Sequence, residues 1–251
     1  MDDNAIKALA ESQSSHWWFI VRREIIRATL CQANLPAQAR ILEIGAGTGG
    51  NLPMLAEFGE ISACEASPCA RELCQTATGI TPEAVSLPEA LPYPAESFDL
   101  VCLLDVLEHI EDDTAALAAI LQPLAKGGKL ILTVPAYPWL FGRHDEFLEH
   151  KRRYTLRELE QKLAQEGFAM TDSRYFNWLL FPLVCLVRLI EKLPGERKPT
   201  GHETPSQPLN ALLTGLFRLE HTLLRNLRPP FGTSILIIAE KVNPPIMQEQ
   251  V

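Results

Sequence analysis

The sequence of 251 residues lacks several patterns that mark specialised classes of protein. No apolar run reaches the 18 residues of a membrane span, and the longest, residues 178–187, contains Pro182. None of the six cysteines belongs to a C-x-x-C pair, and the five-residue steps between Cys64, Cys69 and Cys74 would not make three thiols converge on a helix, so no metal site is expected. The acidic first residues do not resemble a signal peptide. We therefore expect a cytoplasmic protein with reduced thiols.

The sequence also has fewer basic than acidic residues. Lysine and arginine number 23 against 31 aspartates and glutamates, for a net charge of -8, which disfavours a protein that follows nucleic-acid phosphates. The charge is uneven, because residues 1–150 carry -12 and residues 151–251 carry +4. The basic surplus near the C-terminus indicates a surface that meets either an anionic small molecule or a membrane. Peripheral binding to the inner face of the membrane is therefore an open alternative to a purely cytoplasmic location.

Short apolar segments alternate with helical ones along the chain. Strands are expected at residues 41–44, 61–64, 100–104, 130–134, 168–175 and 234–241, and helices at about 48–58, after Ser67-Pro68, at 114–125 with Gly127-Gly128 as the C-terminal cap, and between Thr155 and Gly167. This alternation predicts an α/β fold with a mostly parallel sheet covered on both faces. The last strand follows a long excursion, as in a sheet with a reversed closing strand.

Two regions depart from this alternation. An N-terminal helix is expected at 15–30, and a stretch between the last two strands contains an apolar segment (178–193), a linker rich in proline and charge (194–208) and leucines at helical spacing up to Leu227. We divide the chain into an N-terminal helical cap (1–34), a core (35–176), a helical insertion (177–232), and a final strand with a disordered tail (233–251). The insertion is expected to be a membrane-interface element, a lid, or a hairpin packed on the core or on a second subunit of a homodimer.

A glycine turn follows the first strand. Gly45, Gly47, Gly49 and Gly50 fit both G-x-G-x-G and the dinucleotide spacing G-x-G-x-x-G, and Glu65 lies 20 residues after Gly45, where an acid can accept hydrogen bonds from a ribose. This pattern predicts an adenosine ligand, either NAD or S-adenosylmethionine (SAM). SAM is favoured by Glu43, an acid that could hold its amino group directly or through water, by the strand that breaks into Asp105 and a helical turn, and by the reversed last strand.

With these motifs the sequence resembles the class I SAM-dependent methyltransferases, specifically the bacterial type 11 and type 12 methyltransferase domains. The matching pieces are the segment 43–49, Leu91-Pro92-Tyr93 before Phe98-Asp99, Leu107-Glu108-His109, the aromatic block 16–19 and His150-x-Arg152-Arg153-Tyr154. The resemblance implies a Rossmann-like seven-stranded sheet with SAM over the ends of its first strands. It also implies that S-adenosyl-L-homocysteine is the product.

The resemblance implies a set of cofactor contacts. Gly45, Ala46 and Gly47 would approach the methionine part of SAM, Glu65 would bind the ribose, and Leu104 would present its backbone beside the sulfonium. Gly49, Ala66 and Asp105 complete the expected cofactor set, with a structural role as the alternative for Asp105. Ubiquinone-pathway O-methyltransferases are similar around residues 104–110 and place an arginine against the SAM carboxylate, a role that Arg22 or Arg23 could fill here. Many relatives have an aspartate where this chain has Leu87, so the adenine contact is left open.

The acceptor side is expected in the loop at 143–154. A histidine suits a base at neutral pH, so His150 is the first candidate and His144 the second, with a loop pinned by Asp145 and an arginine as the structural alternative. Arg152, Arg153 and Tyr154 are candidates for binding the acceptor. Trp18 is expected either to cover SAM or the acceptor or to pack its own helix, whereas His109 and Asp99 are interpreted as structural.

These observations predict a methyl transfer from SAM to a small or lipid-linked acceptor, at oxygen rather than nitrogen or carbon. Two alternatives stay open: an NAD-dependent oxidoreductase, which would use the same glycine loop and acid, and a SAM-binding protein without turnover.

Overall fold

The computed structural model describes residues 3–191, 204–224 and 228–242. Its strands are β1 (Ala39–Ile44), β2 (Gly59–Cys64), β3 (Phe98–Leu104), β4 (Leu124–Pro135), β5 (Phe168–Phe176) and β6 (Ser234–Lys241). Its helices are α1 (Asp3–Ser12), α2 (Trp17–Leu30), α3 (Leu52–Leu55), α4 (Pro68–Thr78), α5 (Asp113–Leu121), α6 (Arg143–Phe147), α7 (Leu156–Gln165), α8 (Phe181–Glu191) and α9 (Gln207–Leu224), with short 3-10 turns η1 (Leu107–His109) and η2 (Pro138–Leu140).

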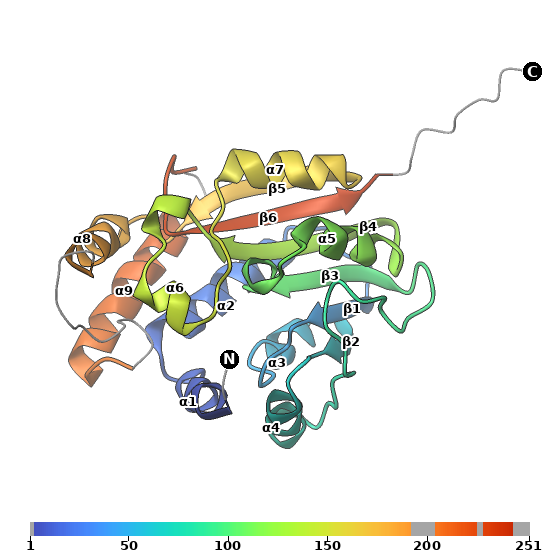
Figure 1. The fold of residues 1–251 in the computed structure, drawn as a ribbon, viewed down its shortest axis with the longest axis horizontal. Helices are drawn as coiled ribbons and strands as arrows, with labels where there is room; N and C mark the ends of the chain where they lie inside the picture. The colour runs from blue at the N-terminus through green and yellow to red at the C-terminus, as the bar shows by residue number, and fades with distance from the viewer. Residues whose placement is uncertain (1–2, 192–203, 225–227, 243–251) are drawn as a thin grey trace, which may run out of the picture.

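The six strands form one sheet in the order β2-β1-β3-β4-β6-β5 (Figure 1). Strands β1 to β4 pair in parallel, whereas β6 runs antiparallel to both β4 and β5. The reversed closing strand expected from the sequence is therefore confirmed. Because β2 and β3 flank β1 on opposite sides, the connections diverge at the carboxyl end of β1, which is where α/β sheets bind ligands.

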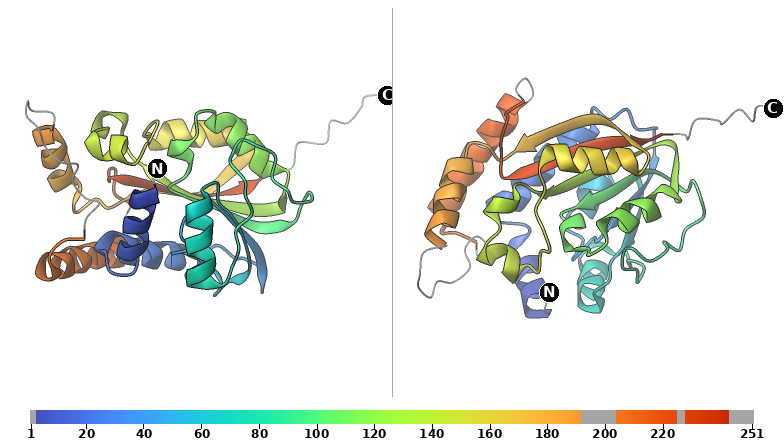
Figure 2. Two further views of the ribbon diagram at one scale, coloured as in Figure 1. Left: turned by 60° about the horizontal axis from the view of Figure 1, so that its bottom comes forward. Right: turned by 45° about the horizontal axis from the view of Figure 1, so that its top comes forward.

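Helices cover both faces of the sheet. Apolar residues of α5 and α7, among them Leu117 and Leu159, pack on one face, and those of α2 and α9, among them Ile25 and Phe217, pack on the other. Figure 2 shows α5 and α7 on one side of the sheet and α2 on the opposite side. The spacing of Val21, Ile25 and the other buried residues of α2 gives this helix one apolar face, which explains why it docks on the sheet.

The expected seventh strand is absent among the described residues. Where the chain passes the outer edge of β2, only an isolated bridge joins Glu83 to Cys64. The segment from Ile80 to Ser97 contains Pro82, Pro88, Pro92 and Pro94, and proline has no N–H to donate to a ladder. A run of prolines at this density explains why the segment crosses the sheet edge without pairing along it.

Two expected helices also differ from the structure. The helix expected at 48–58 is reduced to α3, because glycines at 49 and 50 form the preceding turn and Gly59 already begins β2. Gly127-Gly128 does not cap α5, which ends at Leu121; it lies within β4. By contrast, Ser67 caps α4 and Thr155 caps α7, each accepting a hydrogen bond from a backbone N–H three residues later.

The insertion contributes α8 and α9, which lie beyond the same end of the sheet, α8 toward the face of α7 and α9 toward the face of α2 (Figures 1 and 2). Most of the expected linker, together with Leu227 and the expected disordered tail after Val242, falls outside the described residues. Among the helices that are described, none combines the length and apolar character needed to cross a membrane. The division of the chain into cap, core, insertion and final strand stays a prediction.

Candidate functional site

One large cavity lies at the carboxyl ends of β1, β3 and β4. Its volume is about 1180 Å³, and its lining combines the glycine turn, the ends of these strands, α1, α2, α8 and α9. The position is the point where the connections of β1 and β3 diverge. This volume exceeds the roughly 300–1,000 Å³ typical of a site for one small molecule, so the cavity has room for two ligands.

The glycine turn is shaped by backbone conformation. Gly45 and Gly47 have φ values of +71° and +55°, in the left-handed region that glycine adopts without strain. A Cβ atom on Gly45 would lie 2.6 Å from Cγ2 of Val106, so the turn also requires the absence of a side chain there. Gly45, Ala46 and Gly47 line the cavity, whereas Gly49, with φ of +83°, packs toward Cys74 and does not. Gly49 therefore has a packing role in the structure, and its expected contact with the cofactor stays a prediction.

Glu65 links the glycine turn to the start of α4. One carboxylate oxygen accepts a hydrogen bond of 2.8 Å from the backbone N–H of Gly47, and the other accepts one of 2.8 Å from Ser67. Because a carboxylate offers about four lone-pair sites, both oxygens retain acceptor capacity. Glu65 and Ala66 line the cavity, so this capacity is available to a ligand hydroxyl.

Glu43 lies beneath the turn and is 1% exposed. Its Oε1 accepts a 2.7 Å hydrogen bond from the Asn51 side chain, whereas its buried Oε2 has no partner among the described residues. Burial raises the pKa of Glu43 to about 7, although the Asn51 hydrogen bond and the charge of Arg22 act in the opposite direction. Asn51 lines the cavity and Glu43 does not, so the structure separates Glu43 from direct ligand contact.

Arg22 and Arg23 of α2 both reach the cavity, but each already has a protein partner. Arg22, 4% exposed, pairs with Asp105 at 2.8 Å and donates to the Thr133 hydroxyl at 3.0 Å. Arg23 donates to the backbone oxygen of Gln13 at 2.7 Å. Asp105 follows Leu104 at the end of β3 and has φ of +61°. The expected contact of either arginine with a SAM carboxylate stays a prediction, and Arg22 together with Asp105 forms a charged pair in the cavity wall.

Trp18 has features of both roles that the sequence leaves open, packing within the protein and covering a ligand. Its ring stacks with Phe176 and Phe217 at centroid distances of 5.7 and 5.6 Å, which fastens α2 to β5 and α9. The same residue lines the cavity. Its expected contact with an acceptor stays a prediction.

A charged network surrounds His150, which also lines the cavity. Its Nδ1 lies 2.9 Å from Oδ1 of Asp145, and that oxygen also accepts a 2.8 Å bond from Arg153. Although burial opposes the shift, the hydrogen bond from His150 and the charge of Arg153 hold the pKa of Asp145 well below its ordinary value. An ionised Asp145 accepts hydrogen bonds only, so Nδ1 of His150 is the donor in this pair, and Nε2 is the ring nitrogen that accepts in the neutral tautomer with this arrangement.

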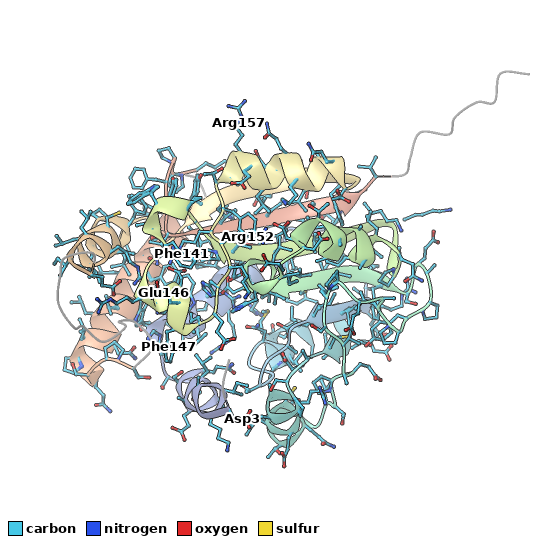
Figure 3. All side chains as sticks on the ribbon, in the orientation of Figure 1. Asp3, Phe141, Glu146, Phe147, Arg152 and Arg157 are labelled. Carbon is cyan, nitrogen blue, oxygen red and sulfur yellow. The ribbon has the colours of Figure 1, made fainter. Side chains whose placement is uncertain are left out.

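Arg152 and Tyr154 do not line the cavity with His150. The Tyr154 hydroxyl donates to Asp113 at 2.8 Å, and Arg152 lies 3.4 Å from the same carboxylate and donates to the backbone of Glu111. Figure 3 labels Arg152 on the segment between α6 and α7. Neither residue lines the cavity, whereas Arg153 does. Both residues thus contact buried Asp113, and their expected contact with the acceptor stays a prediction.

Three groups with metal-ligating atoms gather beside this network. Ligand atoms of Glu108, His109 and His150 all lie within 4.8 Å of one another, and the three residues line the cavity. Burial raises the pKa of Glu108 well above its ordinary value, and burial with the neighbouring His150 lowers that of His109 to about 4. The cysteine spacing gave no sign of this cluster, because the fold brings His150 to η1 from 41 positions along the chain, and the expectation that the chain has no metal site stays a prediction.

The second candidate base, His144, also lines the cavity. Burial and the nearby Arg188 lower its pKa to about 4, and its buried Nδ1 has no hydrogen-bond partner among the described residues. His144 is therefore neutral near pH 7, but it lacks the orienting carboxylate that His150 has.

Sequence reasoning missed several parts of the lining. Ile6 and Leu9 of α1 and four apolar residues before or within α8 face the cavity: Leu180, Leu183, Val184 and Val187. The three-residue spacing of Ile6 and Leu9 was the available signal for α1. Leu87 lines the cavity beside Ser86, which leaves the adenine contact open.

Comparison with known proteins adds to this geometry. A family model described as a methyltransferase domain matches residues 17–179. The ubiquinone biosynthesis O-methyltransferase of Xanthomonas axonopodis pv. citri is 33% identical over 122 residues, which cover 45% of this chain and 48% of that protein. The chain thus matches about half the length of this curated relative.

Solved structures share the fold. A putative methyltransferase of Haloferax volcanii, solved in complex with the Trm112 methyltransferase activator, has a TM-score of 0.60 at 15% identity, with 96% of this chain and 95% of that chain covered. A putative sarcosine dimethylglycine methyltransferase of Galdieria sulphuraria also has a TM-score of 0.60 at 15% identity, with 89% and 86% covered.

Proposed function

The chain belongs to the methyltransferase-domain family of class I SAM-dependent enzymes, and from that premise we propose that it transfers the SAM methyl group to a hydroxyl of a small or lipid-linked acceptor. The supporting observation is that the glycine turn, Glu65 and His150 all line the same cavity. Family membership also favours SAM over NAD as the ligand of the glycine turn.

The cofactor end supplies the contacts that SAM needs. The ribose hydroxyls donate to Glu65, which Gly47 and Ser67 hold in place. The methionine part lies along Gly45 and Ala46, next to the backbone of Leu104. Asn51 presents its side chain to the cavity and is oriented by Glu43 beneath it. Glu43 is therefore a positioning residue in this proposal.

Transfer is a displacement at the methyl carbon. The acceptor oxygen forms a bond to the methyl carbon as the carbon–sulfur bond breaks, its electron pair stays on sulfur, and S-adenosylhomocysteine leaves. The hydroxyl proton goes to Nε2 of His150, whose opposite nitrogen is held by Asp145 at 2.9 Å. The carboxylate–histidine pair is the geometric reason for choosing His150 over His144.

Oxygen is the favoured acceptor atom. A hydroxyl, unlike a tertiary amine or a thiolate, must lose a proton in the reaction, and the oriented imidazole of His150 supplies a base. The matching region of the Xanthomonas relative, an O-methyltransferase by name, supports the same choice.

An apolar acceptor is supported by the lining of the second half of the cavity. Leu183, Val184 and Val187 face it from α8, Leu180 from just before that helix, and Leu209 and Leu213 from α9. Apolar side chains also remain exposed on these helices, including Leu186 (54%), Leu189 (59%) and Leu212 (59%). An acceptor with a lipid tail would meet apolar surface both at the entrance and within.

Contact with a membrane surface follows as part of the proposal. We expect the protein to float with vesicles that contain anionic lipid, and the double substitution Leu186→Ser with Leu189→Ser to reduce binding about tenfold, because two exposed leucines are removed. Val242→Ser, at an exposed apolar position directly after the end of β6, is the control. Equal flotation of wild type, the double variant and the control would contradict the proposed membrane contact. If the wild-type protein is a dimer and the double variant is not, the exposed leucines of α8 bind a second copy of the chain instead.

The experiment that tests the proposed activity uses methyl-labelled SAM. The protein is first tested for thermal stabilisation by SAM and by NADH, and stabilisation by NADH alone would overturn the proposal. It is then incubated with labelled SAM and a lipid extract of the source cell, and the labelled product is identified. A label on a hydroxyl-derived methoxy group is expected. SAM binding without release of S-adenosylhomocysteine on any fraction would instead indicate a binding protein without turnover.

A further inference from the structure

We propose that Glu108, His109 and His150 form a binding site for one divalent transition-metal ion in the wall of the cavity. Ligand atoms from the three side chains lie within 4.8 Å of one another, and Nε2 of His150 is 4.0 Å from Oε1 of Glu108. Two metal–ligand bonds of about 2.0–2.2 Å at a tetrahedral angle place their ligand atoms about 3.3–3.6 Å apart, so the three side chains would move closer together when they bind an ion. The inference goes beyond the proposed methyl transfer and does not depend on it.

The buried carboxylate of Glu108 is the first reason. Its side chain is 0% exposed, and neither oxygen has a hydrogen-bond partner among the described residues. Burial of an acid without partners is costly, and proteins avoid it unless the group is paired or binds an ion. The nearest imidazole nitrogen faces this carboxylate without bonding to it, which leaves a gap between two metal-ligating atoms.

The arrangement behind the two histidines is the second reason. A ligating histidine usually donates its other ring N–H to a carboxylate or a backbone carbonyl, which fixes its orientation. His150 has Asp145 in this position at 2.9 Å, and His109 hydrogen-bonds the backbone of Glu149. The two rings meet edge to face with centroids 4.7 Å apart. Both imidazoles are therefore held in place with one nitrogen directed to the same side.

The ligand set indicates the class of ion. Two imidazole nitrogens and one carboxylate oxygen suit Zn²⁺, Fe²⁺ or Co²⁺, whereas sites for Mg²⁺ and Ca²⁺ use oxygen ligands. All three residues line the cavity, so at least one coordination position would face it. An ion here would occupy the lone pair of His150 Nε2, so the metal-bound form would not use His150 as the base of the proposed transfer. The ion itself would instead lower the pKa of a hydroxyl at its open position.

Metal binding can be measured without SAM or an acceptor, so its failure is distinguishable from a failure of the proposed activity. The full-length protein is dialysed against a chelator and titrated with Co²⁺, which gives visible absorption bands that report its ligands. We expect one Co²⁺ per chain, displaced by Zn²⁺. Glu108→Gln and His150→Gln are each expected to weaken binding by more than about 100-fold, because an inner ligand is lost, whereas changes to outer groups cost about 10–100-fold.

His221→Gln is the matched control, because it removes an imidazole on α9 that does not line the cavity. Circular dichroism and thermal melting establish that each variant is folded. X-ray absorption of the zinc-loaded wild-type protein gives a second readout that needs no variant, and imidazole and oxygen ligands without sulfur are expected. A wild-type protein that takes up no Co²⁺, uptake unchanged in both ligand variants, or sulfur among the zinc ligands would overturn the proposal.

Discussion

The buried carboxylate of Glu43 makes the stability of the protein depend on pH in an unusual direction. Burial raises its pKa from 4.5 to about 7, and the residue is 1% exposed. Because the folded-state pKa lies above the unfolded-state value, the folded protein binds more protons between these values. This contribution to stability is full below the unfolded pKa and is lost as the pH rises through about 7.

The size of the effect follows from the shift. At 1.36 kcal/mol per pKa unit, the ionised carboxylate costs about 3 kcal/mol at pH 8, and most of that is lost from the free energy of unfolding between about pH 5 and pH 8. Glu43→Gln keeps the shape of the side chain and removes its ionisation. The free energy of unfolding of Glu43→Gln minus that of wild type should therefore be about 2 to 3 kcal/mol larger at pH 8 than at pH 5.

The assay is urea-induced unfolding of wild type and variant at several pH values, without ligand. Glu72→Gln, at an exposed position on α4, is the control and should follow the wild-type curve. If the free energies of unfolding of wild type and Glu43→Gln change in parallel from pH 5 to pH 8, the reasoning about burial at this position is refuted.

Three further substitutions test the site. In urea denaturation, Gly45→Ala should lower the free energy of unfolding by about 1–3 kcal/mol more than the control Gly79→Ala. Both glycines have positive φ, but only a side chain at Gly45 would meet Val106. Equal losses in the two variants would contradict this reasoning. Glu65→Gln should raise the Kd for SAM about ten- to hundredfold by calorimetry, because hydrogen bonds to a charged group contribute about 1.5–3 kcal/mol; an unchanged Kd would rule out the ribose contact. His150→Gln should lower kcat about 10²- to 10⁴-fold on the labelled acceptor, and activity near wild type would exclude it as the base.

The positions of the strands were predictable because each buried strand is a short apolar run with a clear boundary, whereas their order in the sheet comes from the structure. The start of α4 and of α7 was likewise visible in Ser67 and Thr155, whose side chains cap the first turn. The end of α5 was not, since Gly127-Gly128 has the composition of a helix cap. Pairing of Leu124 with Phe98 and of Lys129 with Leu100 places these glycines in a shift of the ladder, and long-range pairing overrides the local signal.

The cofactor side and the opposite side of the site also differ in how far local sequence predicts them. The cofactor side is local in sequence, so Gly47 and Glu65 could be assigned from spacing, and the structure joins them by a hydrogen bond. The opposite side is assembled from distant segments. Nothing in the spacing of His150 shows that it lies against Glu108, or that Tyr154, four residues later, turns to Asp113. Such contacts depend on how the loop before α7 packs on η1.

The central claim is that the cavity holds SAM between the glycine turn and His150. A crystal structure of the protein with bound S-adenosylhomocysteine tests it most directly. The account predicts ribose hydroxyls on Glu65, the methionine part along Gly45 and Ala46, and the sulfur atom directed toward the wall that carries His150. A ligand bound elsewhere, or one whose sulfur faces away from that wall, would contradict the account.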